Sequence, residues 1–116
     1  LSPQKEPFLK DAVLLPLSQE LFQHDALVFD DLQSRTITIR SKNNTKSLTM
    51  DFHEFPWFGI WSPVKGAPFV CLEPWLGHAD FADFQGDFFQ KDAIVVLDPG
   101  QSLTRSYTLH IEEQAE

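Results

Sequence analysis

The chain has 116 residues, which corresponds to one domain with room for a hydrophobic core. Hydrophobic residues make up 42% of the sequence and charged residues 22%, a poor fit for intrinsic disorder, low complexity or a coiled coil. The formal net charge of -8 repels nucleic-acid phosphates and anionic lipids alike. We therefore expect neither nucleic acid nor a membrane surface as a partner.

Cysteine usage and the start of the chain bear on its location. No apolar run approaches the roughly 20 residues needed to span a bilayer, and the first residues lack the basic and then apolar pattern of a signal peptide. Cys71 is the only cysteine, so it can form neither an internal disulfide nor a cysteine-based metal cluster. These features predict a cytoplasmic protein. The chain begins at Leu1 rather than Met, which suggests processing or a piece of a longer protein.

The N-terminal part of the sequence predicts short elements. The apolar run 12–17 is interrupted by Pro16 and suggests an irregular edge strand. Ser18 is placed to cap a helical turn over residues 19–22. The four apolar residues 26–29 then indicate a strand.

The clearest strand signal follows. Residues 35–40 alternate polar and apolar side chains, and residues 47–52 alternate again after the polar segment 42–46. The two alternating runs therefore predict a β-hairpin.

The second half of the sequence predicts further strands around one long loop. The apolar runs 57–61 and 68–75 read as buried strands, and residues 77–91 show no clean period and predict a long ordered loop. The run 93–97 predicts another buried strand, and after a tight turn residues 103–111 place apolar side chains on one face of a last strand. About seven short strands without a long helix predict an all-β protein, an antiparallel β-sandwich formed by residues 1–116 as a single domain.

Glu73 is the strongest candidate for chemistry. Strand alternation places Phe69, Cys71, Glu73 and Trp75 on one face, so a carboxylate lies in an apolar and aromatic row. A carboxylate removed from water holds a proton more tightly, which makes it a better base near neutral pH. The alternatives are that Glu73 points to solvent at a strand end, or that it pairs with a buried arginine such as Arg105.

Other polar residues offer weaker candidates. Asp25 precedes a strand and could accept hydrogen bonds from a polyol such as a sugar, although an aspartate there is most often a turn residue. Residues 77–80 could line a pocket rim or form a polar turn. The histidines have no metal-ligand spacing and the aspartates no calcium-loop order, so we expect no metal site; the four histidines are His24, His53, His78 and His110.

The tryptophans could serve a carbohydrate site. Trp57, Trp61 and Trp75 offer flat apolar faces of the kind that contact the C–H face of a sugar ring. Core packing explains most of them equally well, so we expect one or two to face a pocket.

Two longer segments resemble a known family. Residues 55–62 (FPWFGIWS) and 67–75 (APFVCLEPW), followed by Gly77 and Asp80, are similar to the aldose 1-epimerase (galactose mutarotase) family, and most of all to its LacX-like branch. Shorter matches at 25–29, 97–101 and 106–107 extend the resemblance over most of the chain.

The resemblance implies a fold, an activity and a substrate class. The fold would be the antiparallel β-sandwich of galactose mutarotase, and the activity the interconversion of α and β anomers of an aldose such as galactose or glucose, without a cofactor. Glu73 matches the general base of the family, Asp25 its sugar-binding carboxylate, and Trp61 an aromatic position that lines the sugar site.

The resemblance also implies that some catalytic residues of the family have no counterpart in this sequence. Family members are much longer, and none of the four histidines of this chain matches their catalytic histidines, which include the general acid. The chain thus resembles the C-terminal portion of a mutarotase, inactive alone. We expect its unpaired strand edges to associate with a missing N-terminal half or with a second copy. A non-catalytic carbohydrate-binding module is the alternative function.

Overall fold

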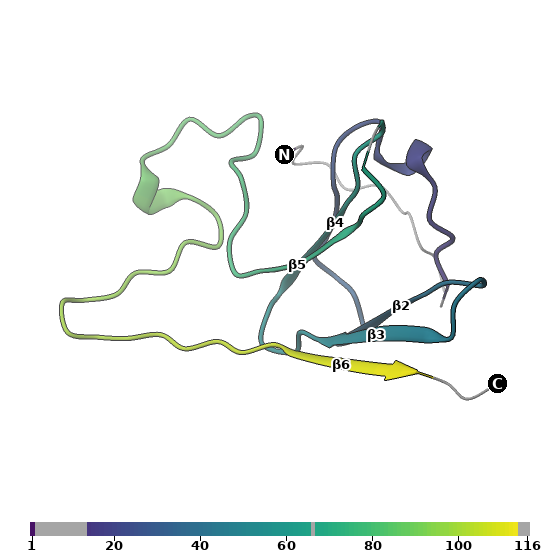
Figure 1. The fold of residues 1–116 in the computed structure, drawn as a ribbon. Helices are drawn as coiled ribbons and strands as arrows, with labels where there is room; N and C mark the ends of the chain where they lie inside the picture. The colour runs from purple at the N-terminus through teal and green to yellow at the C-terminus, as the bar shows by residue number, and fades with distance from the viewer. Residues whose placement is uncertain (2–13, 66, 114–116) are drawn as a thin grey trace.

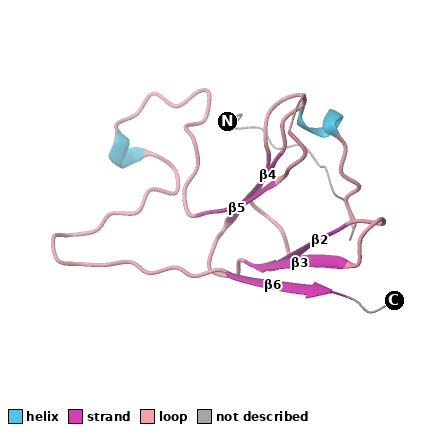
Figure 2. Cartoon of the chain, in the orientation of Figure 1, coloured by secondary structure: helices cyan, strands magenta, loops and turns pink. Residues whose placement is uncertain are grey.

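The computed structural model describes residues 1, 14–65 and 67–113 of the chain (Figure 1). In these ranges the chain forms six short strands and two 3-10 helices joined by long connections (Figure 2). Neither helix in these ranges has the length and apolar character needed to cross a membrane. The elements in chain order are η1 (Gln19–Phe22), β1 (Leu27–Phe29), β2 (Thr36–Arg40), β3 (Lys46–Asp51), β4 (Trp57–Trp61), β5 (Cys71–Trp75), η2 (Phe88–Gln90) and β6 (Thr108–Glu113).

The strands form two antiparallel sheets of three strands each. One sheet has the order β1-β4-β5 and the other the order β2-β3-β6. Every pairing in them is antiparallel. The all-β antiparallel class expected from the sequence is therefore confirmed.

The elements predicted for the first half are largely confirmed. The alternating runs form β2 and β3, which pair as the expected hairpin, with Ile37 opposite Met50. The helical turn forms as η1, but Ser18 makes no capping hydrogen bond with its side chain. The strand expected at 12–17 is absent from its described part, residues 14–17, and residues 12 and 13 lie outside the described ranges.

The core lies where the two sheets face each other. The rings of Phe52 and Phe58 are 4.4 Å apart, and both residues are only 1% exposed. Phe52 directly follows β3 and Phe58 belongs to β4, so this contact joins the two sheets. The buried core residues are Phe22, Met50, Phe52, Phe58 and Ile60.

Arg35 ties the start of β2 to the turn after β3. Its guanidinium donates to the carbonyls of Phe55 at 3.1 Å and Leu32 at 2.7 Å. The same group lies 5.1 Å from the centre of the Phe52 ring. A guanidinium carries several donors in a fixed plane, so one side chain can satisfy two backbone carbonyls and cover an aromatic ring at once.

The second half departs from the sequence prediction. The strand predicted at 93–97 is wrong: within the described residues this run pairs with no strand, and Val95, Val96 and Leu97 are 53%, 61% and 49% exposed. It belongs to an extended segment, residues 93–107, that we call the arm and that projects from the sheets (Figure 1). The last strand starts only at Thr108, and all its residues are exposed. The local pattern specifies a strand, but no described element lies beside it to pair with it.

We predict that Phe58→Ala lowers the free energy of unfolding by about 3–5 kcal/mol or prevents folding, because it removes a fully buried ring and leaves a cavity. Phe89→Ala is the matched control, since Phe89 is 72% exposed and its loss changes stability by about 0.5 kcal/mol or less. Urea unfolding followed by circular dichroism measures both. Equal losses for the two variants would contradict the position of the core.

Candidate functional site

One face of the sheet β1-β4-β5 carries the candidate residues. Antiparallel partners point to the same face of a sheet. Glu73 pairs with Gly59, and Trp75 pairs with Trp57. Phe58 and Ile60, which alternate with these residues along β4, point to the core. The opposite face therefore carries a group that we call the tryptophan face: Trp57, Trp61, Cys71, Glu73 and Trp75. All five of these residues are partly buried.

Glu73 is held in place by its neighbour on the same face. The indole Nε1 of Trp75 donates to Oε2 of Glu73 at 3.1 Å. A Cβ atom added to Gly59 would lie 3.0 Å from the indole and 3.5 Å from Oε2. The missing side chain of Gly59 thus provides the space in which the indole and the carboxylate lie against the sheet. Among the described residues, Oε1 of Glu73 has no hydrogen-bond partner.

The structure distinguishes between the alternatives for Glu73. The carboxylate lies on a partly buried aromatic face rather than at a solvated strand end. Arg105 donates to the carbonyl of Thr104 at 2.8 Å and is exposed, so it is not the buried partner considered from the sequence. Phe69 lies outside β5 and is 48% exposed, so the apolar row is shorter than alternation predicts.

Trp61 and Asp25 lie at the same end of this sheet. Trp61 pairs with Cys71, and its ring centre is 5.9 Å from that of Phe69. Asp25 comes two residues before Leu27, which pairs with the penultimate residue of β4, so it lies near the end of β4. Its backbone has a positive φ of 80°, and its Oδ1 accepts from the amide of Ala26 at 2.8 Å. One oxygen of Asp25 therefore stabilises a turn, which agrees with the alternative that Asp25 is a turn residue.

His78 is a buried residue whose importance the sequence did not reveal. Its side chain is 1% exposed, with Nε2 2.8 Å from Oδ2 of Asp92 and Nδ1 2.7 Å from the carbonyl of Ala79. Both ring nitrogens lie at hydrogen-bond distance from an oxygen, so neither is open to a further partner. The ring centre lies 4.3 Å from that of Trp57 and 4.7 Å from that of Phe81.

His78 therefore fastens the loop after β5 to the tryptophan face. Within residues 77–80 only His78 is buried, against Trp57, while the other three residues are exposed. In the sequence this histidine directly follows Gly77, three residues after the last residue of β5. Its partner Asp92 is 14 residues away, a separation that no local pattern links to it.

Two of the other histidines, His53 and His110, each bond a nearby carboxylate. His53 bonds Asp51 at 2.8 Å, and this hydrogen bond holds the pKa of the Asp51 carboxyl below its usual range. His110 bonds Glu112 at 2.8 Å on the exposed strand β6. Within the described ranges, no three side chains of histidine, cysteine, aspartate or glutamate are grouped as metal ligands.

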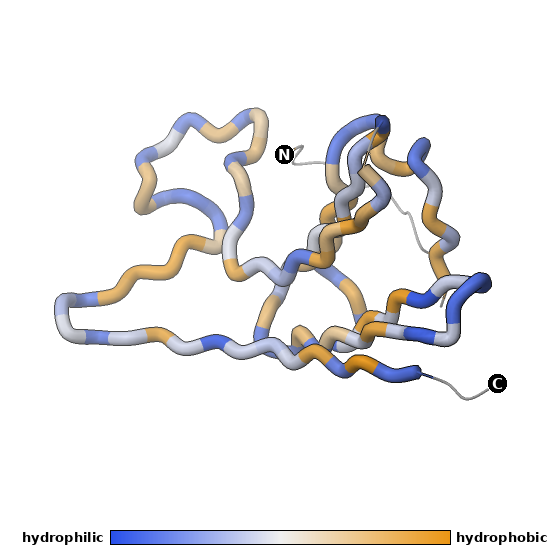
Figure 3. The backbone as a smooth tube through the Cα atoms, viewed as in Figure 1, coloured by the Kyte–Doolittle hydropathy of each residue, from blue (hydrophilic) through white to orange (hydrophobic). Residues whose placement is uncertain are grey.

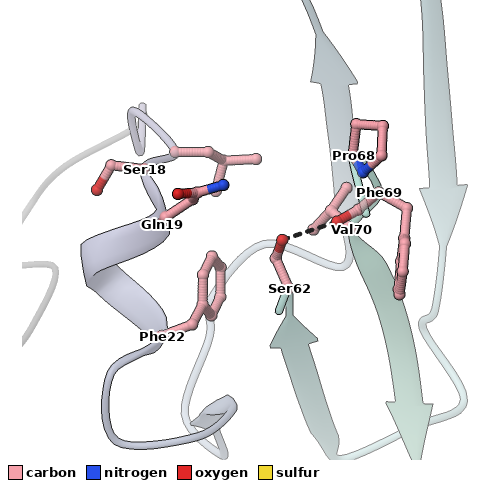
Figure 4. Close-up of a pocket in the computed structure, with 8 residues that line it drawn as sticks. Ser18, Gln19, Phe22, Ser62, Pro68, Phe69 and Val70 are labelled. Carbon is pink, nitrogen blue, oxygen red and sulfur yellow. Dashed lines mark hydrogen bonds between the residues drawn. The ribbon is translucent and has the colours of Figure 1, made fainter. Parts of the chain in front are cut away.

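A shallow pocket of about 310 Å³ lies beside the sheet end (Figure 4). Gln19 and Phe22 of η1 face Ser62 and Val70 across it. The hydroxyl of Ser62 donates to the carbonyl of Phe69 at 2.7 Å, and the lining holds no titratable side chain. Its lining includes neither Glu73 nor Asp25 nor Trp61, so the pocket supplies no acid or base for catalysis. The lining residues are Leu17, Ser18, Gln19, Phe22, Ser62, Pro68, Phe69 and Val70.

Comparison with known proteins gives two kinds of relative, and no family model matches the chain. The plasmid and chromosomal LacX proteins of Lactococcus lactis subsp. lactis are each 35% identical to it over 107 residues. A galactose mutarotase related enzyme from Lactobacillus acidophilus has a similar structure, with a TM-score of 0.69 and 29% identity over 87% of this chain. These similarities support a relation to LacX proteins of the aldose 1-epimerase-like kind.

The match covers this chain far better than it covers the relatives. The LacX matches include 92% of the present chain but only 36% of each LacX protein, and the structural match includes 87% of this chain but only 34% of the solved one. The LacX-like chain thus spans about a third of the length of the curated relatives it matches. Its fold is that of a part of a galactose mutarotase-related β-sandwich.

We predict that Gly59→Ala displaces the indole of Trp75 and weakens its hydrogen bond to Glu73, because the new methyl group overlaps the ring. Such overpacking costs about 1–3 kcal/mol. Gly77→Ala is the matched control, since the nearest atom to its added Cβ is at an ordinary 3.8 Å. NMR of the indole N–H groups should show a shifted and faster-exchanging Trp75 signal in the first variant alone. An unchanged Trp75 signal in Gly59→Ala would contradict the described contact.

Proposed function

We propose that this chain contributes the catalytic base to an aldose 1-epimerase that interconverts the α and β anomers of a sugar such as galactose or glucose. The observation that carries the proposal is the Glu73 carboxylate on the tryptophan face, with Oε2 bonded to Trp75 and Oε1 without a partner among the described residues. Kinship with LacX and with a galactose mutarotase related enzyme supports it.

The proposed step begins at the anomeric hydroxyl of the sugar. Oε1 of Glu73 takes the proton of this hydroxyl while the bond between the anomeric carbon and the ring oxygen breaks and an acid protonates the ring oxygen. The open-chain aldehyde rotates about the adjacent carbon–carbon bond and recloses by the reverse transfers. The bond from Trp75 fixes the carboxylate, so little reorientation is needed before the transfer.

The tryptophan face also suits the recognition of a sugar. Trp61 and Trp75 flank Glu73 on one side of the sheet and present flat apolar surface to the C–H face of a sugar ring. Asp25, near the end of β4, is the proposed second polar contact, through the oxygen that its own turn does not use.

The acid is the part of the reaction that we do not assign to the described residues. His78 is the buried histidine of this sheet face, but both of its ring nitrogens are occupied and its side chain is 1% exposed. It therefore positions the loop after β5 and transfers no proton to a sugar. We propose that the acid comes from the part of a LacX-type protein that this chain does not match, and that the chain alone is inactive.

A second candidate function is sugar binding without turnover. The aromatic face supports it independently, because stacking on Trp61 and Trp75 requires neither an acid nor a base.

We also propose a cytoplasmic location, since Cys71 is the only cysteine and a disulfide framework is absent from the sequence.

The test uses a chimera in which this chain replaces the matched third of Lactococcus lactis LacX. Polarimetry of freshly dissolved α-galactose should show faster equilibration with the chimera, and Glu73→Gln should lower the rate constant by about 10²–10⁴-fold because it removes the base but keeps the shape. Glu20→Gln, on the exposed helix η1, is the matched control and should leave the rate unchanged.

The outcome separates the two functions. A chimera that shifts its tryptophan NMR signals with galactose but accelerates nothing would favour binding without turnover. A rate that survives Glu73→Gln would show that Glu73 is not the base.

A further inference from the structure

The loop after β5, residues 77–92, is closed at its base by two ion pairs. Nε2 of His78 lies 2.8 Å from Oδ2 of Asp92, and Nζ of Lys91 lies 3.1 Å from Oδ1 of Asp80. The loop alternates hydrophilic and hydrophobic residues without a long run of either kind (Figure 3). Within the described residues, the hydrophobic core and the partly buried hydrophobic residues packed against it include none from this loop. The contacts at its base therefore fix the loop relative to the sheet.

One of these two pairs also touches the tryptophan face. The ring centre of His78 lies 4.3 Å from that of Trp57, and the His78 side chain is 1% exposed. Its ring nitrogens lie at hydrogen-bond distance from Asp92 and from a backbone carbonyl, so the ring cannot turn away from the indole without losing both contacts. The pair of Asp80 and Lys91 closes the same loop, but no hydrogen bond, ion pair or ring contact joins it to the tryptophan face in the described structure.

Trp57 lies beside the indole that holds Glu73. Trp57 and Trp75 are opposite partners on β4 and β5, so their Cβ atoms are about 4.5–5.5 Å apart on the same face. The indole of Trp75 lies over Gly59 and donates to Oε2 of Glu73 at 3.1 Å. A Trp57 ring that is held in place therefore restricts the directions in which the Trp75 indole and its hydrogen bond can move.

We infer that His78, held by Asp92, is a positioning residue for the catalytic base. It fixes Trp57, which confines the indole of Trp75. That indole in turn orients the carboxylate of Glu73. The inference rests on the proposed function, in which this carboxylate is the base. His78 itself touches no sugar and moves no proton, and it acts only by keeping the base in the geometry for proton transfer.

Three variants separate this role from general support of the loop. Asp92→Ala removes the partner of His78, and because Asp92 is 58% exposed its loss leaves the packing intact. Asp92→Asn is the conservative rescue, since its amide oxygen still accepts from Nε2. Lys91→Met is the matched control, because it breaks the other ion pair of the same loop and keeps most of the side-chain bulk. Circular dichroism checks that all three variants remain folded.

The first readout is the indole N–H signal of Trp75 in NMR spectra of the 116-residue chain. In Asp92→Ala this signal should shift, and its hydrogen exchange should become about tenfold faster, since a less restrained hydrogen bond opens more often. Asp92→Asn and Lys91→Met should retain the signal of the parent chain.

The second readout is polarimetry of the LacX chimera with galactose. Asp92→Ala should lower kcat by about tenfold while KM changes by less than about threefold, because a misplaced base slows proton transfer and Trp61 remains available to the sugar. Asp92→Asn and Lys91→Met should keep the kcat of the parent chimera.

Three results would overturn the inference. The first is an unchanged Trp75 signal in Asp92→Ala. The second is an equal effect of Lys91→Met, which would show that closure of the loop alone matters. The third is a loss in Asp92→Asn as large as that in Asp92→Ala. A rate that survives Glu73→Gln overturns the proposed catalysis instead, because the Trp75 signal of the free chain still reports whether His78 and Asp92 position this carboxylate.

Discussion

The pairing of β4 with β5 around Gly59 is the constraint on which the rest of the structure depends. Gly59 lies opposite Glu73, and its missing side chain gives the Trp75 indole room to lie on the sheet. Because side chains alternate along a strand, this register also fixes the opposite face. A slip of one residue would expose Phe58 and bury Glu73, so one pairing determines both the core and the candidate site.

The two faces of β4 serve different purposes. Its core face carries Phe58, which contacts Phe52 and thereby joins the sheets. Its other face carries Trp57 and Trp61, which lie beside the candidate base. The loop after β5 adds a second layer over this face through His78. A short sheet can therefore hold a carboxylate rigidly, because packing on one side and a buried polar contact on the other both restrain the strand.

The sequence predicts the parts of this fold that depend on local pattern. The hairpin of β2 and β3 is specified by alternation on both sides of a polar turn, and the placement of Glu73 on an aromatic face follows from the same rule. The bond between His78 and Asp92 could not be predicted, since it joins residues far apart in a loop without periodicity. The run 93–97 was predicted as a buried strand because its composition specifies one, while burial depends on a partner outside the local sequence.

The contact between His78 and Trp57 has a consequence for spectroscopy. The imidazole of His78 lies against the indole of Trp57, with the ring centres 4.3 Å apart, so Trp57 has a different environment from the other tryptophans. The chain contains three tryptophans, and of these only Trp57 has a ring contact with His78. Trp61 and Trp75 lie on the same sheet face as Glu73, so their indoles are intrinsic optical probes of the surface where we place the sugar.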